Sequence, residues 1–303
     1  MRRLPVAAGP LTLLPLVLAT LAGDDDYDPF ALTPPEVVAR AEAARALPLP
    51  ERLEAITEPW VGLPYLLGGL GEGAGPDPQP VTRYDSFDCL TFVEEAVALA
   101  ISPQPARAHE VRMALRYRDG EPWTYENRRH FMLSEWIPGT VAEGWMADIT
   151  QTLTGAEPRQ KIVTPETWAG WSRRGLFSEL SDERLPIGEL NFHVLPIEVA
   201  EDHLEEIPAG AAVFTVRALW DHLPIAISHV GLTISGGRMR HASAMGDKVV
   251  RDDDLGWYVR HVQTYDNWPT EGLIVLVPQE FGPTPGHLAS STPAASSAGS
   301  TSP

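Results

Sequence analysis

The sequence predicts an α+β protein, and two observations carry this prediction. The first half of the 303-residue chain contains runs with helical spacing of apolar residues, whereas the second half contains short β-rich runs. Segregation of helices and strands along a chain is typical of α+β folds. Hydrophobic residues make up 44% of the sequence, close to the globular average, so the chain can bury a sizeable core.

The N-terminal segment has the layout of a secretory signal peptide. A short basic start is followed by an apolar run at residues 11–22, then by small residues and by three acidic residues at 24–26. The apolar run is too short to span a bilayer, and Asp24 stands where a lipoprotein carries its lipidated cysteine. We expect cleavage of residues 1–23 and export to the periplasm or beyond, with no stable membrane insertion. A buried helix or a membrane anchor is the alternative.

Helices are expected over residues 35–47, 51–58 and 88–101, and the last of these should be central because apolar residues cover most of its faces. The Gly- and Pro-rich stretch 68–82 is expected to be a loop. Strands are expected at residues 211–217, 227–234, 239–242 and 273–277. We place one domain over residues 24–281 and a disordered Ser-, Pro- and Ala-rich tail at 282–303. Residues 108–155, rich in aromatics and arginine, give no clear secondary structure.

Charge and cysteine content exclude several classes. The chain carries 41 acidic and 23 basic residues, for a net charge of -18. Without an excess of Lys and Arg it does not fit a binder of nucleic-acid phosphates. Its one cysteine, Cys89, cannot form an intrachain disulfide or a multi-cysteine zinc site. A single free thiol in an exported protein therefore needs a functional reason.

Cys89 stands at the predicted start of the central helix. Asp88 or Ser86 can cap the first turn. A thiol at this position is near the positive end of the helix dipole, so we expect a lowered pKa and a reactive thiolate. An inert, buried cysteine is the alternative.

Two histidines in the β-rich half are candidates for a base. In the run 227–234, His229 and Gly231 point to the same face of the strand, and the small Gly231 leaves room for a neighbour. His241 follows after a Gly236-Gly237 turn. An odd-length or bulged loop places both histidines on one face, whereas a two-residue loop would place them on opposite faces. A joint role for the two histidines therefore requires the odd or bulged loop.

An ordered set of motifs resembles the NlpC/P60 superfamily of cell-wall cysteine hydrolases, and most closely its DUF1460, or N-acetylmuramoyl-L-alanine amidase-like, branch. The motifs are Gly-Leu-Pro-Tyr ending at Tyr65, residues 85–94 around Cys89, and the segments that begin at His229 and His241. Residues 117–120, 125–130, 134–137 and 207–211 resemble the middle of that branch, although the family usually has Asp where Ala211 stands.

The resemblance implies a papain-like fold, in which the cysteine-bearing helix packs on an antiparallel sheet that bears the histidines. It implies Cys89 as nucleophile, His229 as general base, His241 as the orienting third member and Tyr65 near the oxyanion. These roles agree with the chemistry of thiol acyl transfer. The implied reaction is hydrolysis of an amide in peptidoglycan or muropeptide fragments, with no metal and no organic cofactor.

The implied bond joins N-acetylmuramic acid to L-alanine. Such a substrate needs an aromatic wall for the sugar and a cation for the D-Glu carboxylate, and candidates for these roles are Trp123, Tyr125, Arg128, His130 and Trp136. A γ-D-glutamyl–diaminopimelate endopeptidase is the alternative. It would bind a free amine, for which Asp85 or Asp88 could serve.

Two further interpretations stay open. Cys89, His229 and His241 could hold zinc, although their spacing is not that of a metal site. The chain could also be a non-catalytic wall-binding module on the same fold. Among other residues, Trp168 and Trp171 are expected in the core, and the run 252–254 of three aspartates is expected to be a solvated turn.

Overall fold

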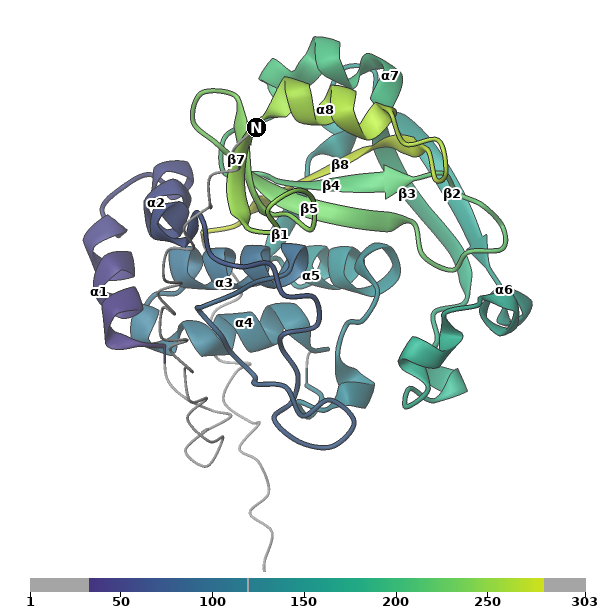
Figure 1. Ribbon diagram of the computed structural model, residues 1–303, viewed down its shortest axis with the longest axis horizontal. Helices are drawn as coiled ribbons and strands as arrows, with labels where there is room; N and C mark the ends of the chain where they lie inside the picture. Colours follow the sequence, from purple (N-terminus) through teal and green to yellow (C-terminus); the bar gives the residue numbers. More distant parts are fainter. Residues whose placement is uncertain (1–32, 119, 281–303) are drawn as a thin grey trace, which may run out of the picture.

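The computed structural model describes residues 33–118 and 120–280, so the expected signal peptide and the expected tail lie outside the described residues. An eight-stranded antiparallel sheet is surrounded by helices (Figure 1). The strand order is β2-β3-β8-β4-β5-β6-β7, with β1 also paired to β8. The expected mixture of helices and antiparallel sheet is confirmed.

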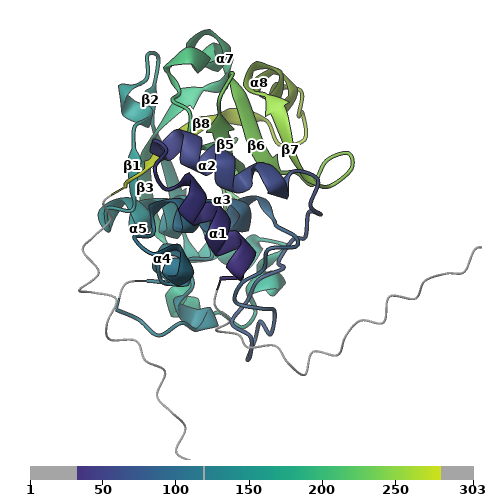
Figure 2. The same ribbon diagram turned by 90° about the vertical axis from the view of Figure 1, so that its left-hand side faces the viewer.

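The helices of the first half lie on one side of the sheet, and Figure 2 shows α1 and α2 beside it from a second direction. Their bounds are α1 Pro35–Ala44, α2 Leu49–Thr57, α3 Cys89–Ile101, α4 Ala108–Arg116 and α5 Ile137–Ala142. The three helices expected from the sequence correspond to α1, α2 and α3. Residues 68–82 form a loop, as expected.

The remaining elements belong mostly to the sheet and to the layer above it. The strands are β1 Met146–Asp148, β2 Glu157–Val163, β3 Gly188–Pro196, β4 Ala212–Arg217, β5 Ile227–Ile234, β6 Arg238–Ala242, β7 Val250–Asp254 and β8 Thr270–Pro278. The helices are α6 Pro165–Gly170, α7 Ile197–Ala200 and α8 Leu255–Gln263. Among the described helices, none is long and apolar enough to cross a membrane.

Two hydrophobic cores lie on opposite faces of the sheet. On one face, Phe92 and Val93 of α3 pack with Phe214 of β4 and Val230 of β5. On the other face, a core of α7 and α8 side chains includes Tyr258 and packs on Val213 of β4 and Val275 of β8. Burial of apolar side chains on both faces explains why β4 is an almost continuous apolar run. Trp168 and Trp171 are buried in a third cluster, which confirms their expected place in a core.

Buried ion pairs join α3 to α4 and fix the direction of the central helix. Glu94 accepts hydrogen bonds from Arg116, at 2.8 and 2.9 Å, and Glu95 accepts one from Arg112 at 2.8 Å. All four side chains are almost completely buried. Removal of one partner from such a pair leaves an uncompensated charge in the core, so these contacts hold α3 in place. The N-terminus of α3 is therefore presented to the sheet by a rigid support.

Candidate active site

Cys89 is the first residue of α3, and Asp88 caps the helix. The Asp88 carboxylate accepts a hydrogen bond from the backbone N–H of Thr91 at 2.8 Å, while the Thr91 hydroxyl accepts one from the backbone N–H of Asp88 at 2.9 Å. This reciprocal capping box sets the direction in which the helix begins. Of the two expected caps, Asp88 is the one used. Cys89 itself is partly exposed.

His229 and His241 lie on the same face of the sheet and contact each other. Strands β5 and β6 pair with Ile234 opposite Arg238, so residues 235–237 form a three-residue loop. The loop is odd, as a joint role for the histidines requires. The rings contact through Nε2 of His229 and Nδ1 of His241 at 2.6 Å.

A glycine makes room for the close approach of the two histidines. A Cβ added at Gly231 would lie 2.7 Å from the Cβ of His241, closer than real Cβ contacts. The expected space-making role of Gly231 is thus confirmed by the geometry. His241 is fully buried, and the ring of Tyr258 lies 5.6 Å from it and 6.0 Å from that of His229.

Asp253 contacts His241 and continues the series of contacts that starts at His229. This role of Asp253 was not predicted from the sequence. Its Oδ2 lies 3.0 Å from Nε2 of His241, and its Oδ1 accepts a hydrogen bond from Nε of Arg251 at 2.9 Å. The expected solvated turn at 252–254 is wrong, because these residues end β7. Because side chains alternate along the strand, Asp252 contacts Arg240 and Asp253 contacts His241. Asp254, at the end of the strand, caps α8.

The order of contacts assigns the protons of both histidines. Although burial opposes it, hydrogen bonds from His241 and Arg251 lower the pKa of Asp253, so this side chain is a carboxylate. A carboxylate only accepts, so His241 carries a proton on Nε2, and in its neutral form the ring then accepts at Nδ1. His229 must then donate from Nε2, which leaves its Nδ1 as a free base. Asp253 therefore sets the tautomers of both histidines.

Cys89 lies against β5 at Val230, the residue that follows His229. The β5–β6 pairing covers Leu232 to Ile234 and stops short of His229. Next to His229, the backbone N–H of Val230 interacts with the Cys89 thiol. Within the described residues no hydrogen bond joins Sγ to His229. Catalytic hydrogen bonds are often looser in the unliganded state.

The thiol is not the low-pKa group that its position at a helix start predicts. Burial and the nearby Asp88 raise the pKa of Cys89 to about 12, against the lowering effect of the backbone N–H groups. Burial, His241 and Arg217 hold the pKa of His229 well below its usual value. The helix dipole is therefore outweighed by desolvation, and the expectation of a resting thiolate is wrong. At neutral pH both groups rest uncharged.

We therefore expect iodoacetamide to alkylate Cys89 slowly at mildly acidic and neutral pH, with a rate that keeps rising into the alkaline range. A neutral thiol reacts only through its small thiolate fraction, and each pH step increases that fraction. Mass spectrometry of quenched time points measures the rate from pH 5 to pH 10, with glutathione as the reference thiol. A fast alkylation rate that stays constant from neutral pH down to pH 5 would instead indicate a resting thiolate–imidazolium pair.

Tyr65 lies close to Cys89, in a segment that pairs with Phe87. Its backbone N–H donates to the carbonyl of Lys248 at 2.7 Å, and the neighbouring Leu66 donates to Phe87 at 2.9 Å. These bonds tie the Tyr65 segment to the residues that precede α3. Burial, followed by Cys89 and Asp88, raises the pKa of Tyr65, so its phenol stays protonated and can donate a hydrogen bond.

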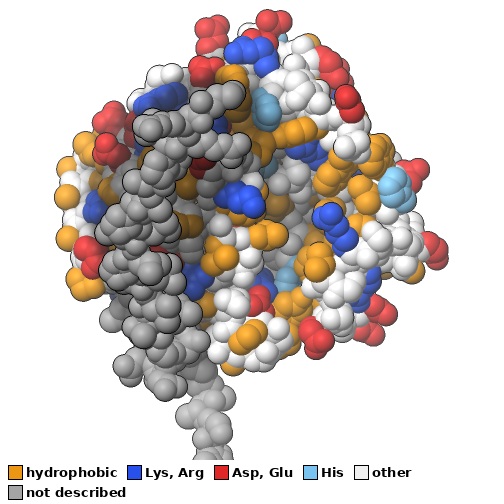
Figure 3. Space-filling model, in the orientation of Figure 1, with side chains coloured by type: hydrophobic (Ala, Val, Ile, Leu, Met, Phe, Trp, Pro, Cys, Tyr) orange, Lys and Arg blue, Asp and Glu red, His pale blue; other side chains and the backbone are white. Residues whose placement is uncertain are grey.

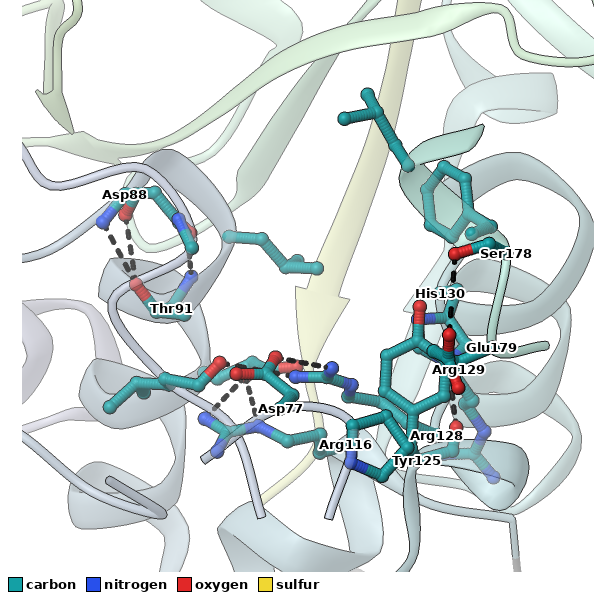
Figure 4. Close-up of a pocket in the computed structure, with 17 residues that line it drawn as sticks. Asp77, Asp88, Thr91, Arg116, Tyr125, Arg128, Arg129, His130, Ser178 and Glu179 are labelled. Carbon is teal, nitrogen blue, oxygen red and sulfur yellow. Dashed lines mark hydrogen bonds and ion pairs between the residues drawn. The ribbon is translucent and has the colours of Figure 1, made fainter. Parts of the chain in front are cut away.

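A cavity of about 490 Å³ opens beside the start of α3. In Figure 4, Asp88 and Thr91 lie on one side of it, and Tyr125, Arg128 and His130 lie on the other. Thus three of the five expected substrate contacts line one pocket together with Asp88 and Thr91 from the start of α3. On the molecular face in Figure 3, most acidic side chains lie around the rim, while hydrophobic and basic ones occupy the middle.

Two of the expected substrate contacts need correction. Trp136 is fully buried, donates from its indole N–H to Glu94 at 3.0 Å and packs on Phe214, so it cannot form a groove wall. Arg128 lines the cavity, but its guanidinium already pairs with Asp77 at 2.7 Å and with Glu72 at 3.3 Å. It is therefore not free to bind a substrate carboxylate through its fork.

The other candidates have structural partners as well. Trp123 packs in a small cluster with Val81 and Tyr117. His130 contacts the carbonyl of Tyr125 at 2.6 Å, and burial, helped by Arg128, lowers its pKa to about 4, so its ring is uncharged at neutral pH. In the described part of the chain, no group of three or more His, Cys, Asp or Glu side chains is arranged to hold a metal ion.

Comparison with protein families gives the assignment. The model of the AmiA-like, or N-acetylmuramoyl-L-alanine amidase-like, family matches residues 55–265. The chain belongs to this family. The matched region contains Tyr65, Cys89, His229, His241 and Asp253, so the whole arrangement described above falls within the family region.

Solved structures share the AmiA-like fold. A Legionella pneumophila protein of the DUF1460 family is 21% identical, covers 80% of this chain and 93% of its own, and has a TM-score of 0.67. A Bacteroides uniformis N-acetylmuramoyl-L-alanine amidase is 20% identical, covers 76% and 99%, and has a TM-score of 0.62. A proposed xylanase from Bacteroides fragilis is 23% identical, covers 73% and 98%, and has a TM-score of 0.57. A comparison with curated proteins found no match.

Proposed function

We propose that this AmiA-like protein is an exported cysteine amidase that acts on peptidoglycan or muropeptide fragments, with a papain-like arrangement of the NlpC/P60 type. The observation that carries the proposal is the chain of contacts from Asp253 through His241 to His229, next to Cys89 at the start of α3. Such a chain supplies a nucleophile, a base and the groups that orient the base.

In the proposed reaction, Nδ1 of His229 takes the proton of the Cys89 thiol as Sγ attacks the amide carbonyl carbon. The carbonyl oxygen becomes an oxyanion, for which the Tyr65 phenol and the backbone N–H of Cys89 are the proposed donors. The buried Asp253 carboxylate stabilises the positive charge that develops on the histidine pair.

Collapse of the tetrahedral intermediate breaks the C–N bond. The proton held on His229 passes to the leaving nitrogen, which departs as an amine, and the acyl group stays on Cys89 as a thioester. A water molecule, deprotonated by the same nitrogen of His229, then attacks the thioester carbonyl. The acid is released and the proton returns to Sγ, so the enzyme ends as it began.

We propose the N-acetylmuramoyl–L-alanine bond as the bond cut. The family name supports it, and so does the cavity beside the start of α3, where Tyr125 and His130 offer a ring surface to a sugar. The endopeptidase alternative has less support, because both Asp88 carboxylate oxygens already accept hydrogen bonds, from Thr91 and Gly68. Asp85 is exposed and pairs with Arg83.

Digestion of a defined muropeptide tests this proposal. The amidase should release an intact stem peptide with a new L-Ala amino end, together with a sugar free of peptide. An endopeptidase that binds a free L-Ala amine would leave the sugar-linked stem intact and would cut the free stem peptide, supplied as a second substrate, into L-Ala–γ-D-Glu and a peptide with a new diaminopimelate amine. Product masses separate the two outcomes, and detection of the second set alone would overturn the amidase proposal. A xylan oligosaccharide is the negative control.

A further inference from the structure

Arg217 differs from the other buried arginines of the described chain. Six arginines have less than a tenth of their surface exposed within residues 33–118 and 120–280. Five of them pair with a carboxylate, and Arg217 is the one without a carboxylate partner there. The paired five are Arg52, Arg112, Arg116, Arg129 and Arg240.

Neutral groups hold the Arg217 guanidinium in place. Nε donates to the Ser228 hydroxyl at 2.7 Å, and one terminal nitrogen, Nη1, donates to Thr270 at 2.7 Å and to the carbonyl of Trp268 at 3.4 Å. The guanidinium also lies over the ring of Tyr265, 4.7 Å from its centre. The other terminal nitrogen, Nη2, has no partner among the described residues, and it is not one of their fully enclosed orphan atoms.

This arrangement is costly unless an anion completes it. A cation taken out of water loses its hydration, and a matching negative charge is the usual compensation in protein interiors. Burial accordingly lowers the pKa of Arg217. Its neutral partners fix the direction of the side chain without neutralising it, as expected for a site that binds an anionic ligand.

The place of Arg217 connects it to the proposed active site. Ser228, which accepts from Nε, is the residue before His229, and β4 pairs with β5 through Thr215 and His229. The charge of Arg217 also contributes to the low pKa of His229. An anion bound at Nη2 would therefore lie close to the base.

We propose that Arg217 anchors a subsite for a carboxylate of the wall fragment, namely the α-carboxylate of the D-Glu residue that follows L-Ala. The inference rests on the proposed function for the identity of the fragment. Arg217 takes the place of Arg128 as the expected cation, because the Arg128 guanidinium is already paired with carboxylates, whereas Arg217 has no carboxylate partner among the described residues. The contact is a charge-assisted hydrogen bond from Nη2 to the carboxylate, and Arg is the residue best suited to it.

The test compares two ligands that differ in one group: N-acetylmuramoyl-L-alanyl-D-isoglutamate, with the free α-carboxylate, and its α-amide. Calorimetric titration of the uncleaving Cys89→Ala protein should give about 10- to 100-fold tighter binding for the free acid, the range of one hydrogen bond to a charged group. Adding Arg217→Gln should remove this preference, while Arg217→Lys should keep part of it. Arg260→Gln, an exposed arginine on α8, is the matched control and should change nothing.

Equal affinity of the Cys89→Ala protein for the two ligands would overturn the inference, even if Arg217→Gln fails to fold. Retention of the preference in a folded Arg217→Gln protein would overturn it as well. The two proposals fail separately, because binding is measured without hydrolysis. If the native protein cleaves the muropeptide but shows no preference for the free carboxylate, only the Arg217 subsite is rejected. If the preference is present but the native protein does not cleave, only the amidase proposal is rejected.

Discussion

Replacement of Cys89 or His229 by alanine is expected to abolish hydrolysis of a defined muropeptide. Nucleophile and base act as a unit, so either loss should cost on the order of 10⁶-fold in kcat, as in proteases with the same logic. The Cys89→Ala change is small, and α3 keeps its Asp88 cap and its buried ion pairs. Initial rates, measured by product chromatography, give the comparison.

His222→Ala is the matched control for the histidine variant. His222 is exposed and stacks on Trp220, outside the proposed machinery, so its loss should leave the rate unchanged. Thermal unfolding of each variant separates a loss of catalysis from a loss of folding. Substantial activity in Cys89→Ala would exclude the cysteine mechanism.

Asp253→Asn is expected to cost about 10⁴-fold, because it reverses the proton order of both histidines, as the corresponding change does in serine proteases. Arg251 binds Oδ1 of residue 253 and requires an acceptor there. The amide oxygen therefore faces Arg251, and the amide N–H₂ faces His241. Nε2 of His241 becomes an acceptor, its proton moves to Nδ1, and His229 must carry its own proton on Nδ1, where the base is needed.

A second change should partly reverse this loss. In the double variant Asp253→Asn/Arg251→Gln, the guanidinium that held the amide oxygen of residue 253 is gone. The amide can then turn its oxygen to His241, which restores the original tautomers of both histidines. Nitrogen-15 NMR of the imidazoles reports the tautomers directly. It therefore distinguishes a change of tautomer from a loss of activity that is caused only by a disturbed structure. Asp252→Asn is the control, since Asp252 pairs with Arg240 on the other side of the strand. An unchanged tautomer in Asp253→Asn would contradict this account.

Local patterns in the sequence were sufficient for the parts of the site that depend on nearby residues. The capped helix at Cys89 follows from Asp88 and an apolar run, and the requirement for an odd loop between His229 and His241 follows from strand alternation. Both are local or depend on one hairpin, and the structure has both.

Residues whose role depends on distant partners were misjudged. Trp136 looked like a sugar platform, but Glu94 and Phe214, remote in sequence, enclose it. Arg128 looked free because its carboxylate partners come from the 68–82 loop. Three consecutive aspartates resemble a turn, yet the strand distributes them to three partners. The only signal for Asp253 in the sequence was strand alternation, which would place its side chain on the same face as His241. This signal could not be used, because residues 250–254 were not predicted to be a strand.

Trapping of an acyl-enzyme on Cys89 is the most direct test of the cysteine mechanism. The protein is mixed with a muropeptide that retains its sugar, quenched in acid within milliseconds, and its intact mass is measured, followed by peptide mapping. We expect a thioester on Cys89 that carries the muramoyl lactyl group and no amino acid. An adduct that includes L-Ala and D-Glu would show that a different bond is cut, and turnover with no adduct on Cys89, even when product release is slowed by cold, would contradict the cysteine mechanism.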